Sequence, residues 1–161
     1  MFKKTLKTQN KKAKLLMITL FIFGVALLFV SGSVPLKPLW QILGFVSVAA
    51  AVYIATVFVL KEYTVSIFFP EGSSVPDFAI YEFRSNREIK VCHISISDIR
   101  EIKVITPENA KAEKEKRKGL KSYRYNTFFD CKEFIEIITD EDISITVTYD
   151  EELYKALKTY I

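Results

Sequence analysis

Two long uncharged stretches occupy much of the N-terminal third of the chain. No charged residue occurs from Leu15 to Leu36 or from Pro38 to Leu60. At a rise of about 1.5 Å per residue, each stretch is long enough to cross a hydrocarbon core of roughly 30 Å. The pattern therefore predicts a transmembrane hairpin over residues 15–60, with helices at about 15–33 and 38–60.

A cleaved signal peptide is the alternative interpretation of the first stretch. The small residues Ser31, Gly32 and Ser33 resemble a signal-peptidase site. The length of the apolar run, and the second stretch that follows it at once, favour a helix that is retained in the membrane.

Beyond Leu60 the apolar positions recur with a period of two, which is typical of β-strands. Turn residues separate the alternating segments in "PEGSSVP" at 70–76, "SNR" at 85–87 and "DED" at 140–142. About seven short strands are therefore expected. They cover residues 63–69, 77–83, 88–96, the end of 97–105, 122–128, 133–139 and 143–149.

The last residues change to a helical period. Asp150 is a suitable N-cap, and the acidic side chains of Glu151 and Glu152 suit the first turn of a helix. The apolar residues then follow at spacings of three and four, which predicts an amphipathic helix with one buried face. That face consists of Leu153, Ala156, Leu157, Tyr160 and Ile161.

The order of these elements, with "HISISDIREIKVI" at 93–105 and "DEELYKALKTYI" at 150–161, resembles the pleckstrin-homology-like (PH-like) fold. A hairpin joined directly to such a domain is similar to the bacterial PH-domain membrane proteins. The resemblance implies a membrane α-hairpin plus a mainly-β domain, in which a bent antiparallel sheet or barrel of about seven strands carries a C-terminal capping helix. It also implies a binding or scaffolding role. The basic first loop of phosphoinositide-binding members is missing, because residues 70–77 contain no cation.

The charges are distributed unevenly, although the net charge is only +4. All 19 acidic residues lie after Leu60, whereas the segment before Leu15 has lysines and no acid. The positive-inside rule therefore places both termini in the cytoplasm. The expected organisation is a basic cytoplasmic N-terminal arm at 1–14, the hairpin at 15–60 and a cytoplasmic PH-like domain at 61–161. The lysines of the arm are Lys3, Lys4, Lys7, Lys11, Lys12 and Lys14.

Small residues form a stripe along one face of the second predicted helix. Such a stripe lets helix backbones approach closely in lipid. Two interpretations stay open, which are packing against the first helix and formation of a homo-oligomer. The stripe consists of Gly44, Ser47, Ala51 and Ala55.

The segment from 108 to 124 is strongly basic and lacks an apolar face, so it is predicted to be a loop with at most a frayed helical turn. One interpretation is a solvated loop, and the other is a contact with anionic lipid headgroups next to the bilayer. Nucleic acid is disfavoured, because the domain is net acidic and attached to a membrane. The candidate lipid contacts are Lys111, Lys114, Lys116, Arg117, Lys118, Lys121 and Arg124.

No motif for catalysis, for a cofactor or for a metal is recognisable, and no such site is predicted. His93 and Cys92 are neighbours on a predicted strand, so they point to opposite faces and cannot form a nucleophilic pair. Cys131 has no partner at metal-ligand spacing. The expected function is that of a non-enzymatic integral protein of the cell (inner) membrane, which presents a binding or adaptor module to lipid or to a protein partner. The alternative is a regulatory or protective accessory subunit of membrane machinery that acts through the hairpin.

Overall fold

The computed structural model describes residues 1–6, 10–30, 35–84, 87–126 and 132–160. The chain divides into two compact units. Residues Thr8–Lys61 form a helical hairpin, and Met1–Lys7 together with Glu62–Ile161 form a β-domain. The small residues at 31–33, considered above as a cleavage site, lie outside the described residues.

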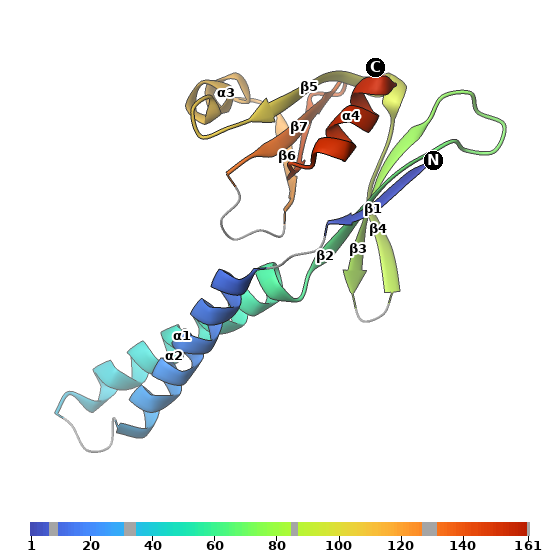
Figure 1. Ribbon diagram of the computed structural model, residues 1–161. Coiled ribbons are helices and arrows are strands. Elements are labelled where there is room, and N and C mark those ends of the chain that lie inside the picture. Colours follow the sequence, from blue (N-terminus) through green and yellow to red (C-terminus); the bar gives the residue numbers. More distant parts are fainter. Residues whose placement is uncertain (7–9, 31–34, 85–86, 127–131, 161) are drawn as a thin grey trace. The chain divides into compact units, whose positions relative to one another are not determined.

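The hairpin consists of two antiparallel helices that are drawn in blue and cyan in Figure 1. Helix α1 spans Lys11–Val30, and helix α2 spans Lys37–Ile54 and continues as the π-helix η1 at Ala55–Val59. Both are long and apolar enough to cross a membrane, as the sequence predicts. Their outward side chains are largely apolar and exposed, which suits a lipid environment. Examples are Leu15, Phe21, Ile22, Phe29, Ile42, Phe45 and Val52.

Glycines bring the two helices into close contact. A Cβ atom added to Gly24 would lie 2.8 Å from the carbonyl oxygen of Gly44, and one added to Gly44 would lie 2.8 Å from Cγ of Leu28. Both distances are too short for a real contact, so only glycine permits this approach of the backbones.

A buried amide connects the open ends of the hairpin. The Asn10 side chain donates from Nδ2 to the carbonyl oxygen of Phe58 at 2.8 Å. Phe58 lies in η1, where the change of helical register alters the usual backbone pairing. Asn10 therefore joins the start of α1 to the end of α2.

The first sheet of the β-domain has four antiparallel strands in the order β1-β2-β3-β4. Strand β2 spans Glu62–Phe68, β3 spans Asp77–Arg84 and β4 spans Arg87–Ser95. The first strand, β1 at Phe2–Leu6, differs from the basic arm expected at 1–14. Its inward face has only two apolar residues, Phe2 and Leu6, and the lysines between them obscure the alternating apolar pattern of a strand. It pairs with β2 in a register that runs from Phe2 opposite Ile67 to Leu6 opposite Tyr63.

The second sheet has the order β5-β7-β8-β6. It contains β5 (Ile99–Ile105, after the 3₁₀ turn η2 at Ile96–Asp98), β6 (Lys121–Tyr125), β7 (Phe134–Thr139) and β8 (Ile143–Thr148). The expectation of an antiparallel sheet is wrong at β6, which pairs with β8 in parallel. The segment between β5 and β6 is long enough for a crossover to the far edge of the sheet. It contains helix α3 (Ala110–Lys116), where a loop with at most a frayed helical turn was predicted.

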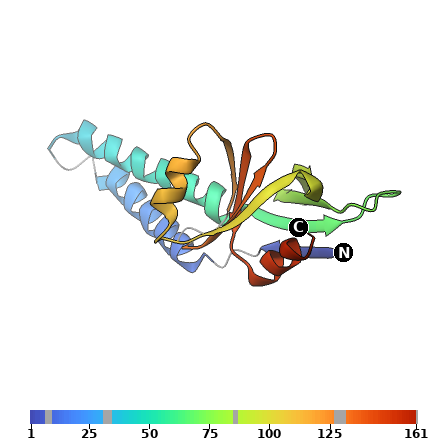
Figure 2. The same cartoon turned by 90° about the horizontal axis from the view of Figure 1, so that it is seen from above.

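Helix α4 at Glu151–Thr159 completes the domain as the sequence predicts, but Tyr160, expected on its buried face, is exposed, and Ile161 lies outside the described residues. The Asp150 side chain accepts a hydrogen bond from the Leu153 N–H at 3.0 Å, and Leu153 and Leu157 are fully buried. In Figures 1 and 2, α3 (orange) and α4 (red) lie apart on the domain. Both sheets and α4 share one core. Its most buried members are Val65, Ile67, Phe78, Ile80, Ile135, Ile137, Ile145, Val147, Leu153 and Leu157.

Ion pairs tie β1 to the first turn of α4. Lys4 Nζ lies 2.8 Å from Asp150 Oδ2 and 2.6 Å from Glu152 Oε2. Burial alone would raise the pKa of Asp150, but hydrogen bonds from Lys4 and from the Leu153 N–H outweigh it and lower the pKa. Strand β1, which was not predicted from the sequence, is therefore held by its pairing with β2 and by its ion pairs with α4.

Candidate functional site

The charges of α3 are sorted between a side that faces the domain and a side that faces outward. On the domain side, Glu113 accepts hydrogen bonds from Lys116 at 2.8 Å and from Lys103 at 3.2 Å. The hydrogen bonds from Lys116 and from Lys103 lower the pKa of Glu113, although burial acts in the opposite direction. Ion pairs to β5 and within the helix thus replace the apolar face that the segment lacks.

Arg117 follows α3 and turns inward to Glu136 on β7. Its Nε lies 2.6 Å from Glu136 Oε1, and the Glu136 side chain is fully buried. The Nε–H is not aligned for a hydrogen bond, so the interaction is chiefly electrostatic. The Ser144 hydroxyl donates to the same carboxylate oxygen at 2.5 Å. This buried pair holds the end of the basic segment on the second sheet.

Most of the predicted lipid contacts point outward. Lys111 and Lys114 are exposed one turn apart on α3, and Lys118 is exposed in the following turn. Lys121 lies over the ring of Tyr123 at 5.4 Å, and Arg124 is exposed on β6. Within the part of the chain that the structure describes, none of these five has a carboxylate partner. The structure therefore separates them from Lys116 and Arg117, whose charges are paired.

The small-residue stripe of α2 lies partly against α1. Gly44 and Ala51 are buried, and Ser47 and Ala55 are half-buried. Gly44 and Ser47 lie in the close contact with Gly24. A partner helix that used the same stripe would have to displace α1 from this contact.

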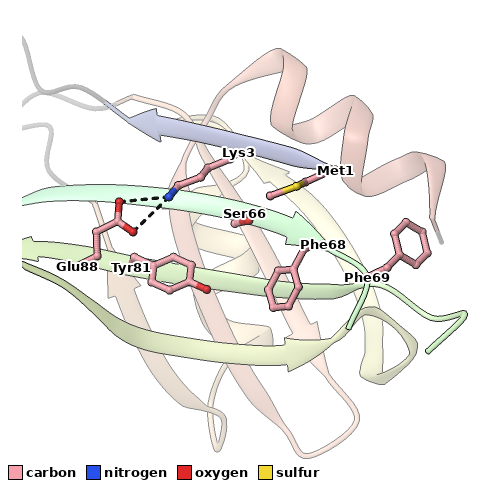
Figure 3. Close-up of a pocket in the computed structure, with 7 residues that line it drawn as sticks. All are labelled: Met1, Lys3, Ser66, Phe68, Phe69, Tyr81 and Glu88. Atoms are coloured by element: carbon pink, nitrogen blue, oxygen red, sulfur yellow. Dashed lines mark hydrogen bonds and ion pairs between the residues drawn. The ribbon is translucent and has the colours of Figure 1, made fainter. Parts of the chain in front are cut away.

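A second candidate surface was not predicted from the sequence. The outward face of the first sheet has a cavity of about 530 Å³, which is in the size range of small-molecule sites. Side chains from four strands, from the residue before β1 and from the residue after β2 surround it, as Figure 3 shows. They are Met1, Lys3, Ser66, Phe68, Phe69, Tyr81 and Glu88. The lining includes the unpredicted strand β1, so sequence patterns alone could not reveal it.

The surroundings of the single histidine, His93, and of Cys92 indicate structural roles for both residues. His93 Nε2 lies 2.7 Å from Asp77 Oδ2, and its ring stacks on Phe68 with centroids 6.2 Å apart. Burial raises the pKa of the Cys92 thiol to about 11, which disfavours a reactive thiolate. Cys131 lies outside the described residues. Among the described residues, no three His, Cys, Asp or Glu side chains gather as metal ligands.

Comparison of the chain with protein-family models, with curated proteins and with solved structures gives no match. The PH-like resemblance therefore rests on the order and pattern of the elements.

Proposed function

We propose that this protein is a membrane-anchored, non-enzymatic binding or adaptor module, with a PH-like domain on the cytoplasmic face of the cell (inner) membrane. The observation that carries the proposal is the pairing of β1 with β2. Strand β1 precedes the hairpin, β2 follows it, and the two are neighbours in one sheet. One folded domain therefore receives both ends of the apolar hairpin.

This connectivity supports a definite topology. If the hairpin spans a membrane, its two ends must emerge on the same side, because β1 and β2 can pair only there. The first turn of α1 contains Lys11, Lys12 and Lys14, whereas Lys37 is the only charged residue between the two apolar stretches. The positive-inside rule then favours the cytoplasm for the whole β-domain.

Reporter fusions test this topology. We expect a fluorescent protein fused after Ile161 to fluoresce in a bacterial host, and alkaline phosphatase fused at the same place to be inactive. Phosphatase fused within the connection after α1, at Leu36, should be active. An active phosphatase after Ile161 would refute the cytoplasmic placement.

The outward lysines of the α3 segment are proposed to contact anionic lipid headgroups. A cation near an anionic surface contributes roughly 1 kcal/mol. The five outward cations, Lys111, Lys114, Lys118, Lys121 and Arg124, are therefore enough to orient a domain that the hairpin already tethers.

Hydrogen exchange of the full chain in lipid nanodiscs tests this contact. We expect the amides of α3 to exchange more slowly when phosphatidylglycerol replaces phosphatidylcholine, and added salt to remove the difference. Changing Lys111, Lys114 and Lys118 to Gln should abolish the protection. Changing Lys90, Lys155 and Lys158 to Gln, as a control of equal charge, should preserve it. Equal exchange rates of the α3 amides in the two lipids would show that α3 does not contact anionic headgroups.

A further inference from the structure

The cavity on the first sheet has a charged end and an apolar end. In Figure 3, Lys3 and Glu88 meet at one end, and the side chains of Met1 and Phe68 lie toward the other. Tyr81 and Ser66 lie between these ends. Met1 and Phe69 are exposed, which leaves apolar surface available to a ligand.

An ammonium group already occupies the charged end. Lys3 Nζ lies 3.3 Å and 3.2 Å from the two carboxylate oxygens of Glu88, and 5.9 Å from the centroid of the Tyr81 ring. A carboxylate combined with an aromatic face is a combination that recognises organic cations. Lys3 therefore shows which kind of charge this part of the cavity accommodates.

Lys3 is also easy to displace. The side chains of Lys3 and Glu88 are 49% and 44% exposed, and pairs this exposed contribute little to stability. A ligand ammonium could take the place of Lys3, which would then turn into solvent. A ligand anion could instead take the place of Glu88, but it would lie beside the Tyr81 ring, whose face attracts cations and not anions. The Tyr81 ring thus favours a cationic ligand.

We propose that this cavity binds an organic cation with an apolar body, and that Lys3 competes for the cation position. The ligand's ammonium group contacts Glu88 and the Tyr81 ring. Its apolar body lies against Phe68 and Met1. This inference specifies a ligand class for the proposed binding module, but it depends neither on the membrane topology nor on α3.

Methionine labelling gives a direct test with the full chain in phosphatidylcholine nanodiscs. The chain has two methionines. Met1 lines the cavity, whereas Met17 lies in α1 and reports unspecific partition into the bilayer. The ¹³C-methyl resonances are followed while 2-phenylethylamine, 2-phenylethanol or 3-phenylpropionate is added. These probes share a phenyl ring and are cationic, neutral and anionic.

We expect a saturable shift of Met1 with the amine, weaker binding of the alcohol and the weakest binding of the carboxylate, with Met17 unchanged. Lys3→Gln should tighten amine binding roughly two- to fivefold, because the competitor is removed. Glu88→Gln should weaken it roughly tenfold. Any other order of the three probes overturns the proposal.

Two matched variants control for general charge effects. Lys158 lies 5.9 Å from the Tyr154 ring but outside the cavity, and Glu141 is exposed in a turn. Lys158→Gln and Glu141→Gln should leave amine binding unchanged. The proposal fails if these variants act like Lys3→Gln and Glu88→Gln. A negative result in the methionine experiment would not affect the reporter-fusion and hydrogen-exchange results, so the two proposals are tested separately.

Discussion

The outward faces of the two sheets each carry a cation–carboxylate pair, but in different environments. On the first sheet, Lys3 and Glu88 are 49% and 44% exposed. On the second sheet, Arg117 is 16% exposed and Glu136 is fully buried. The chemistry of the two pairs is similar, so the comparison isolates the effect of burial.

Burial decides what each pair can do. An exposed pair is screened by water and is easily exchanged for other partners. A buried pair cannot be broken cheaply, because the remaining charge would have neither water nor a counter-ion. The first face is therefore suited to ligand exchange, whereas the second face fixes the basic segment in place.

The sharpest test of this comparison is Arg117→Met. It leaves the Glu136 carboxylate buried without its cation, so the β-domain should lose about 3–5 kcal/mol of unfolding free energy. Urea unfolding in nanodiscs, followed by near-ultraviolet circular dichroism of the tyrosines, measures the loss. The neighbouring exposed variant Lys118→Met should stay within about 0.5 kcal/mol of the parent protein. Equal effects of the two variants would mean that the buried pair does not hold the segment.

The core beneath both faces provides the second test. Leu157→Ala removes a fully buried side chain of α4 and should cost about 2–5 kcal/mol. The exposed Lys158→Ala on the same helix should cost no more than about 0.5 kcal/mol. Hydrogen exchange should show that Leu157→Ala weakens strands of both sheets. Loss of protection in only one sheet would contradict a shared core.

The Lys4–Asp150 pair is intermediate, with side-chain exposures of 33% and 22%. Asp150→Ala removes the helix cap and one of the two carboxylate partners of Lys4, while Glu152 remains, and should cost about 0.5–2 kcal/mol in the same urea experiment. A loss of unfolding free energy as large as that of Arg117→Met would show that the Lys4–Asp150 pair behaves like the buried pair.

The pH dependence of this effect has a definite sign. Because the folded state lowers the pKa of Asp150, its contribution is present above the ordinary aspartate value of about 4 and is lost as pH falls through the lower folded value. The difference between Asp150→Ala and the parent should therefore be full at neutral pH and should shrink in acid. A difference that grows in acid would refute the assignment.

The smallest effect is expected at the exposed pair. Lys3→Gln and Glu88→Gln should each change the stability of the domain by less than about 1 kcal/mol. Their double variant should show a coupling energy within the same limit. Thermal unfolding in the absence of ligand provides the check, and a coupling as large as that of a buried pair would remove the contrast between the two faces.

Local periodicity was enough to predict the hairpin, the strands β2, β3, β4, β7 and β8, and the helix α4. In each of these segments the apolar residues recur at the spacing of the element itself, so the information lies within a few neighbouring residues. The burial of Leu157 was predictable for the same reason.

Strand β1, helix α3 and the position of β6 were decided by the tertiary structure. Strand β1 is short and lysine-rich, and it becomes a strand because β2, which is far away in the sequence, pairs with it. Helix α3 has no apolar face, and ion pairs with Lys103 and Lys116 support it instead. The parallel pairing of β6 with β8 follows from the crossover, which local spacing does not encode.

The cavity depends on the same long-range assembly. The positively charged residues near the N-terminus favoured a membrane-flanking arm when they were considered alone. In the folded chain, Lys3 meets Glu88 from 85 residues away, and Lys4 meets Asp150 from 146 residues away. Spacing along the chain determined the elements, because hydrogen bonding and side-chain alternation are local. The sites were determined only when sheet pairing brought distant charges within contact distance.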